Sequence, residues 1–213
     1  VNGKKIGSIA DCTVFSFCGN KVLTTGEGGA ITTNSKEVYE KIKLIRSHGR
    51  VDTSDYFSNP SLSQYIGLGY NWRMSSITAA LGISQLQKLD KIIKMRKDNA
   101  QYLSKHLSKI PKIKTPNITA NHDHIYQMYT ILLENKIIRD DLHNFLIKKE
   151  IFSKVYFHPI LKTKFYSKFN ASNNLSVTEM ISDKALTIPL YPNMTQEEKK
   201  YLIDSIMEFF DSI

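Results

Sequence analysis

The hydrophobic pattern of the first fifty residues predicts two short strands and a helix. Residues 12–17 are mainly β-branched and aromatic, which predicts a buried strand. Gly29 to Thr33 predicts a second strand, directly after a glycine-rich turn (26–29) whose glycines allow backbone angles that other residues avoid. Ser35 is a typical helix N-cap and predicts a helix behind it. The apolar face of that helix consists of Val38, Ile42 and Ile45.

The middle of the chain predicts a long loop followed by a long helix. Residues 47–73 are loop-like, and a loop of that length inside a domain is usually functional or partly mobile. Ser75 or Ser76 caps the predicted helix, which continues to about Ser108 and is ended by Pro111. A helix this long often connects two domains.

Strands and helices alternate in the remaining residues, as in an α/β or α+β domain. Strands are predicted over 126–134, 152–156 and 185–190, with helices over 140–149 and after the capping box Thr195-x-x-Glu198. The pattern predicts three parts: an α/β part (1–75), a connecting helix (76–110) and a small α+β domain (111–213).

Charge and composition narrow the possible functions. The 213 residues carry a net charge of +9, from 29 Lys+Arg against 20 Asp+Glu. This charge suits an anionic partner such as nucleic acid. Lysines scattered over solvated faces explain it better, because the sequence has no block of five or six like charges and no basic residues interleaved with aromatics. No run approaches the ~20 apolar residues of a membrane span.

The two cysteines and the histidines do not indicate a metal site. Cys12 and Cys18 lie six residues apart, and we expect two buried, reduced thiols, although a disulfide between them is an alternative. His and Cys residues nowhere have metal-ligand spacing, so we expect no metal.

Lys21 is the main candidate for chemistry. It lies between the strand-like residues 12–17 and the glycine-rich turn. A lysine that forms an imine must be deprotonated part of the time near neutral pH, which desolvation in a pocket favours. Ser16 and the backbone N–H groups of the turn are possible phosphate donors, so the group suits pyridoxal phosphate. The alternative is a solvated turn lysine. The phosphate loop of nucleotide triphosphatases and the dinucleotide-binding glycine motif are both absent.

Three blocks of the sequence resemble the DegT/DnrJ/StrS family of sugar aminotransferases. Residues 16–29 (SFCGNKVLTTGEGG) are similar to the family's lysine motif, and residues 46–49 (RSHG) to its next block. Residues 68–74 (LGYNWRM), with AALG at 79–82 and QL at 85–86, resemble the block at the start of the long helix. The resemblance implies an α/β fold: the C-terminal portion of a fold-type I pyridoxal-phosphate-dependent transferase.

The resemblance also implies roles for individual residues. Lys21 would be the catalytic residue that bonds to pyridoxal 5'-phosphate and later shuttles a proton, and Ser16 would bind the cofactor phosphate. Asn71 would reach the cofactor of a neighbouring subunit, which implies a homodimer; the alternative is that residues 71–73 only anchor the long helix. The resemblance places Arg73 near the same site, but relatives vary at this position, and His48 is more often a structural loop histidine, so neither is assigned a role.

Family members transfer an amino group, usually from glutamate, to a nucleotide-linked keto sugar in the cytoplasm for surface polysaccharide or O-antigen synthesis. Residues 16–21 and 126–130 (YQMYT) look most like the GDP-perosamine synthase branch, which acts on a 4-keto-6-deoxy sugar. Residues 155–161 (VYFHPIL) depart from the family pattern, because Leu161 stands where a histidine is usual.

The resemblance starts after the family's aspartate that faces the pyridine nitrogen. Without that aspartate the cofactor is a weaker electron sink, so we expect these 213 residues alone not to be a competent transaminase. Two alternatives are a truncated, inactive paralogue that serves as a binding or dimerisation module, and a basic nucleic-acid-binding domain.

Overall fold

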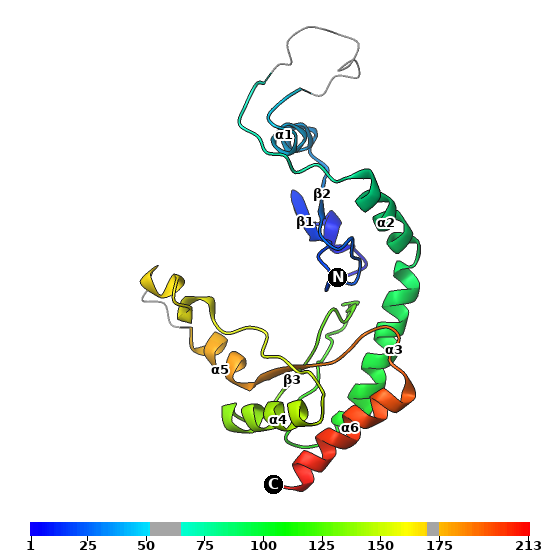
Figure 1. The fold of residues 1–213 in the computed structure, drawn as a ribbon, viewed down its shortest axis with the longest axis vertical. Coiled ribbons are helices and arrows are strands. Elements are labelled where there is room, and N and C mark those ends of the chain that lie inside the picture. The colour runs from blue at the N-terminus through cyan, green and yellow to red at the C-terminus, as the bar shows by residue number, and fades with distance from the viewer. Residues whose placement is uncertain (52–64, 170–174) are drawn as a thin grey trace. The chain divides into compact units, whose positions relative to one another are not determined.

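The computed structural model describes residues 1–51, 65–169 and 175–213, and the chain divides into two compact units, Val1–Leu89 and Asp90–Ile213 (Figure 1). The first unit contains a short 3-10 helix η1 (Ile6–Ser8), strands β1 (Cys12–Ser16) and β2 (Gly29–Thr33), and helices α1 (Lys36–Arg46) and α2 (Ser76–Gln87). The two strands form an antiparallel hairpin in which Val14 lies opposite Ile31 and Ser16 opposite Gly29. The predicted positions of both strands are therefore confirmed to within one residue.

The prediction that the first strand is buried is wrong. Four of the five residues of β1 are exposed, Val14 and Phe15 among them. Cys12, expected to be buried, is an exposed free thiol, and Cys18 is a half-buried one. The apolar residues of 12–17 correctly indicate a strand, but within the described part of the chain no layer covers it.

Helices α1 and α2 begin at the predicted caps. The Ser35 hydroxyl accepts from the Val38 N–H at the start of α1, and the Ser75 hydroxyl accepts from the Thr78 N–H at the start of α2. Each hydroxyl satisfies one of the N–H groups that a helix leaves unpaired at its first turn.

The single long helix predicted from Ser75 to Ser108 is two helices. α2 ends at Gln87, and α3 runs from Leu89 to Leu107. At the break, the Lys88 N–H donates to the carbonyls of Gln85 and Leu86 instead of the carbonyl four residues back. The apolar side chains of the two helices also differ in burial. Leu103 and Leu107 of α3 are fully buried, whereas Ile77 of α2 is 86% exposed.

The second unit has a continuous hydrophobic core. Strands β3 (Tyr129–Leu132) and β4 (Ala185–Ile188) form an antiparallel pair that begins with Tyr129 opposite Ile188. Helices α3, α4 (Lys136–Lys148) and α6 (Gln196–Asp211) bury their apolar faces in the same core as this pair. Leu103, Tyr129, Ile131, Leu142, Leu146, Leu186 and Ile206 are fully buried there.

Three details of the second unit differ from the sequence prediction. The helix predicted at 140 begins four residues earlier, because the Asn135 side chain accepts from the Ile138 N–H. Residues 152–156 are not a strand: Lys154 alone forms a bridge, with Thr187. Helix α5 (Ser176–Lys184) was not predicted, nor were the 3-10 helices η2 (Ile160–Lys162) and η3 (Tyr166–Phe169). The capping box of α6 is confirmed, since Thr195 and Glu198 each accept from the other's backbone N–H.

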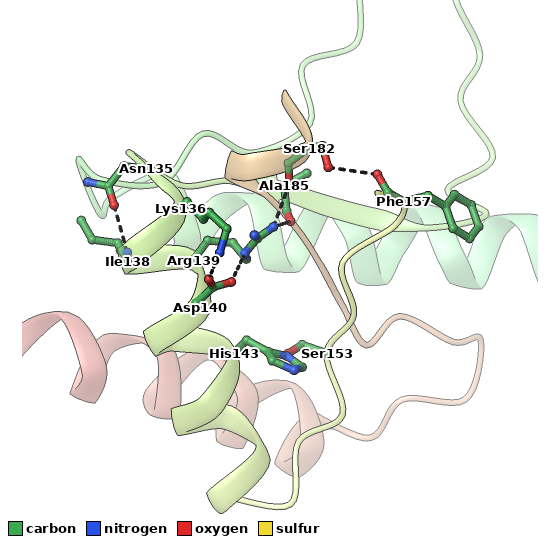
Figure 2. A network of polar contacts seen from close by, with 10 residues as sticks. All are labelled: Asn135, Lys136, Ile138, Arg139, Asp140, His143, Ser153, Phe157, Ser182 and Ala185. Carbon is green, nitrogen blue, oxygen red and sulfur yellow. Dashed lines mark hydrogen bonds and ion pairs between the residues drawn. The ribbon is translucent and has the colours of Figure 1, made fainter. Parts of the chain in front are cut away.

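A buried arginine joins α4 to the end of α5 (Figure 2). Arg139 is 1% exposed, and its Nη1 donates to the carbonyls of Ser182 (2.8 Å) and Ala185 (3.3 Å). Its Nε donates to Asp140 Oδ1 at 2.6 Å. Because the last carbonyls of a helix lack an intrahelical donor, this guanidinium satisfies the C-terminal end of α5.

Other buried polar groups of the second unit are also paired. Arg96 donates to the carbonyls of Tyr126 and Gln127, and burial lowers its pKa. The Tyr129 hydroxyl lies 2.7 Å from Ser104 Oγ, and burial raises the pKa of Tyr129 to about 12. Burial within the second unit is therefore the main cause of the shifted pKa values of Arg96 and Tyr129. None of the helices described is both long and apolar enough to cross a membrane.

Candidate functional site

Lys21 lies in a tight loop at the tip of the β1–β2 hairpin. The Phe17 N–H donates to the Gly28 carbonyl, and the Phe17 carbonyl accepts from both the Thr25 N–H (2.9 Å) and the Thr24 hydroxyl (3.1 Å). Within the loop, the Lys21 N–H donates to the Cys18 carbonyl at 2.9 Å. The backbone at Lys21 is therefore held by hydrogen bonds at the stem and inside the loop.

Ser16 is the last residue of β1 and lies at the stem of the same loop. Its Oγ accepts from the Cys18 N–H at 3.3 Å. This bond uses an oxygen lone pair and leaves the hydroxyl proton available to a further acceptor. Ser16 is exposed and Lys21 half-buried, so the structure places both candidates on one loop with polar atoms available for a ligand.

The glycine-rich turn packs closely against the segment that precedes α2. Gly28 has φ of +151°, and a Cβ there would lie 2.6 Å from Thr25 Oγ1 and 3.1 Å from the terminal methyl of Met74. A Cβ at Gly82 of α2 would lie 3.1 Å from the Thr25 methyl group. Thr25 is itself buried. The turn therefore needs glycine at position 28, and it brings the Lys21 loop next to Met74 and α2.

Asn71 lies on a segment that pairs with the residues at the end of α1. The His48 N–H donates to the Tyr70 carbonyl and the Trp72 N–H to the Arg46 carbonyl, both at 2.9 Å. Ser47 and Asn71 form an antiparallel bridge between these bonds. Backbone hydrogen bonds thus join the two ends of the predicted loop over 47–73. Residues 52–64 of that loop lie outside the described part of the chain.

Two glycines allow this pairing. Gly49 has φ of +70°, and a Cβ on it would lie 1.8 Å from the Gly67 carbonyl oxygen. A Cβ on Gly69 would lie 2.0 Å from the Gly49 nitrogen. The two backbones therefore approach more closely than any residue with a side chain would permit.

The pairing places Asn71 beside Arg73 and His48, two residues to which the sequence assigned no role. Arg73 Nε donates to Asn71 Oδ1 at 3.2 Å, and Arg73 Nη2 lies 3.5 Å from His48 Nε2. All three side chains are exposed. The contact of His48 with Arg73 was not predictable locally, because the two residues lie 25 positions apart in the sequence.

A hollow of about 1090 Å³ lies between the hairpin, α1 and the segment before α2. Val14, Ile31, Ile42, Ile45, Trp72 and Met74 contribute apolar side chains to it. Lys43, Arg46 and Arg73 also line it. The hollow is therefore largely apolar, with these three cations and the carboxylate of Glu27, and neither Lys21 nor Ser16 contributes to its wall.

The residues of the Lys21 loop fit part of what pyridoxal phosphate requires. They supply a primary amine, a hydroxyl with a free proton and a turn in which glycine 28 is sterically required. The described residues place no carboxylate on this loop except Glu27, whose Oε1 lies 3.6 Å from Cys18 Sγ.

Comparison with known proteins identifies the class of protein. Residues 1–207 match the DegT/DnrJ/EryC1/StrS aminotransferase family, and the chain belongs to that family. It is 29% identical to GDP-perosamine synthase of Vibrio cholerae over 215 residues, which are 100% of this chain and 56% of the relative. It is 33% identical to UDP-4-amino-4,6-dideoxy-N-acetyl-beta-L-altrosamine transaminase of Campylobacter jejuni, over 99% of this chain and 55% of the relative.

The same family appears among solved structures. The Helicobacter pylori PseC structure, an aminotransferase involved in the biosynthesis of pseudoaminic acid, superposes with a TM-score of 0.91 at 29% identity. The match covers 99% of this chain and 56% of PseC. The chain thus spans about half the length of the relatives it matches, and it corresponds to the C-terminal part of their α/β fold.

Proposed function

We propose that this chain carries the lysine-bearing part of a pyridoxal-phosphate-dependent aminotransferase. The reaction would move an amino group, from glutamate, to a nucleotide-linked 4-keto-6-deoxy sugar for surface polysaccharide synthesis. The observation that carries the proposal is the closed loop around Lys21, with Ser16 at its stem, in a chain of this aminotransferase family.

Each residue of the loop has a definite task in this proposal. Lys21 would hold the cofactor through its Nζ. Once an incoming amine has replaced it there, the free Lys21 amine would move a proton between two carbons that stand in a 1,3 relation. Ser16 would donate a hydrogen bond from its hydroxyl to the cofactor phosphate. Bound pyridoxal phosphate would supply the electron sink for the transfer. The stem hydrogen bonds would keep the amine in place between turnovers, since Lys21 lies in a loop that is closed at Phe17.

Asn71 would act at the site of a second copy, so the proposal includes a homodimer. Its Oδ1 accepts from Arg73 Nε, which orients the amide so that its NH2 group faces away from the guanidinium and can donate elsewhere. The exposure of the Asn71 side chain is what such a role needs.

The test is to locate the lysine that captures the cofactor. The chain would be mixed with pyridoxal phosphate, reduced with borohydride, digested and mapped by mass spectrometry. Labelling concentrated at Lys21, with yellow absorbance lost in Lys21→Arg, supports the proposal. The matched control is Lys94→Arg, an exposed lysine of α3 that should leave the absorbance unchanged. Ser16→Ala should weaken binding about tenfold, because one hydrogen bond to a charged group is lost.

Equal labelling of Lys21 and the surface lysines would refute the assignment. The same result would favour the second candidate, an inactive paralogue that acts as a binding or dimerisation module. The extensive exposed apolar surface of the first unit is the observation in favour of that candidate.

A further inference from the structure

A small hollow lies within the second unit, at the C-terminal ends of α3 and α6. Its volume is about 420 Å³, which is in the usual range for sites that bind small molecules. One wall consists of the end of α3 and the turns that follow it, and the other wall consists of the end of α6. None of the residues given a role in the proposed aminotransferase lines this hollow.

The floor of the hollow is apolar and continuous with the core of the second unit. Ile110 and Phe210 line it, and both pack against the buried core. The Phe210 ring also meets the buried Phe209 ring edge to face, with the ring centroids 5.1 Å apart. Pro111 and Met207 add exposed apolar surface. Covering this surface with an apolar group removes it from water, which favours binding.

The rim of the hollow carries charged groups without partners. Lys109, Lys112 and Asp211 line it, and all three side chains are exposed. Within the described residues, none of the three takes part in an ion pair. Two ammonium groups against one carboxylate leave an excess of one positive charge. This excess suits a monoanion, and the Asp211 carboxylate disfavours a ligand of higher negative charge.

Hydrogen bonds fix the backbone on both sides of the hollow. After α3, the Ile113 N–H donates to the Ile110 carbonyl at 3.0 Å. At the end of α6, the N–H and the hydroxyl of Ser212 both donate to the Phe209 carbonyl. The walls are therefore formed before a ligand arrives, which lowers the entropic cost of binding.

The His106 ring forms part of the wall and is also held in place. Its Nδ1 lies 2.8 Å from the Tyr102 carbonyl, and the two ring centroids are 4.5 Å apart. Because a carbonyl only accepts, Nδ1 carries the hydrogen, and Nε2 of the neutral ring is an acceptor. The lysines therefore supply the donors for an anion.

The position of these lysines is not explained by the helix end alone. Cations in the last turn of a helix offset the partial negative charge of its final carbonyls, and this effect falls off within one turn. Lys105 and His106 lie in the last turn of α3, which ends at Leu107. Lys109 and Lys112 lie beyond the end of α3, and both face the hollow.

We propose that this hollow binds a small amphipathic monocarboxylate. The carboxylate would lie between Lys109 and Lys112, and an aliphatic or aromatic tail would cover Ile110, Met207 and Phe210. A volume of about 420 Å³ suits a small molecule better than a polypeptide, whose interface would extend well beyond it. The site lies wholly in the second unit and goes beyond the function proposed for Lys21, so either proposal can fail without the other.

Methyl NMR of the full chain locates the ligand. The chain has six methionines, of which Met207 lines this hollow and Met74 lines the larger hollow of the first unit. The chain, labelled with carbon-13 at its methionine methyl groups, would be titrated with octanoate, and a Met207→Leu variant would assign the Met207 signal. We expect a saturable shift of that signal. Acetate lacks the tail and octanol lacks the charge, so each should bind at least about tenfold more weakly.

Three variants test the assigned charges. Replacing both donors, by Lys109→Gln together with Lys112→Gln, should weaken octanoate binding about tenfold. Asp211→Asn should strengthen binding about twofold, because it removes a repulsive carboxylate. Lys105→Gln is the matched control: it removes an exposed charge from the same helix end without touching the hollow, so the affinity should not change. All four side chains are exposed, so no core is disturbed.

Any of four outcomes would overturn the proposal. The first is no saturable shift of Met207 with millimolar octanoate. The second is an equal affinity at Met74 and Met207 that the double lysine variant leaves unchanged, which would mean adsorption to any exposed apolar surface. The third is an equal loss of affinity in Lys105→Gln and in the double lysine variant. The fourth is a short peptide of leucine and aspartate that binds more than about tenfold tighter than octanoate, which would assign the hollow to a polypeptide.

Discussion

Replacement of Arg139 by methionine tests how the second unit is held together. The guanidinium donates to two backbone carbonyls and to Asp140, and methionine keeps an apolar stem of similar length without any donor (Figure 2). The change therefore removes hydrogen bonds while it leaves most of the packed volume in place.

The expected loss follows from the contacts. The Ser182 carbonyl, at 2.8 Å, loses its donor at the end of α5, which costs about 1–3 kcal/mol. The Ala185 contact is longer, at 3.3 Å, and adds less. Asp140 keeps Lys136 as a partner at 2.5 Å and its side chain is 42% exposed, so it adds little. We expect Arg139→Met to lower the free energy of unfolding by about 3 kcal/mol.

Urea unfolding followed by far-UV circular dichroism measures this loss. For a slope of about 2 kcal/mol per molar urea, the midpoint should fall by about 1.5 M. Hydrogen exchange of α4 peptides assigns the transition to the second unit. The control is Lys136→Met, which removes the exposed ammonium group that pairs with Asp140. It should lower the free energy of unfolding by less than about 1 kcal/mol. Equal effects of the two variants would refute the role given to the buried guanidinium.

Two further predictions concern the first unit and the pH dependence. Gly49→Ala should destabilise the pairing of residues 44–50 with 65–73 by about 2 kcal/mol or more, because its Cβ would meet the Gly67 carbonyl at 1.8 Å. Emission of Trp72, the single tryptophan, measures the effect, and Gly67→Ala, whose Cβ meets open space, is the control that should change little. The hydrogen bond from Lys136 is the main cause that lowers the pKa of Asp140, and the hydrogen bond from Arg139 also lowers it. The free energy of unfolding of wild type should exceed that of Asp140→Asn by less than about 1 kcal/mol. This difference should be complete above pH ~4 and should disappear as the pH falls through the lowered pKa of Asp140. Urea unfolding at pH 7 and at pH 2–3 measures it, and an undiminished advantage at the lower pH would contradict the assigned cause.

Local signals in the sequence predicted the starts of α1, α2 and α6 and the position of β2. Ser35, Ser75 and the Thr195–Glu198 capping box each mark the first turn of a helix, because the cap and its partner lie within three residues. The loop of Lys21 was also predicted from adjacent residues.

Features that depend on distant partners were not predictable in this way. The apolar residues of β1 indicate a strand but cannot tell whether another layer covers it. The break at Lys88 contains neither proline nor glycine, so no local signal marks it. The only β-contact of residues 152–156 in the described chain is the bridge to Thr187, more than thirty residues later. The arrangement of His48 with Arg73 depends on a similar long-range pairing.

The closed loop at the tip of the hairpin has a consequence for sequence variation. Its stem is joined by backbone atoms of Phe17, Thr25 and Gly28, and its inner turn by backbone atoms of Lys21 and Cys18. Main-chain bonds of this kind do not depend on which side chain follows the strand. Position 18 can therefore carry different side chains while the backbone at Lys21 keeps its place, so the residue at position 18 is a poor guide to whether the loop is intact.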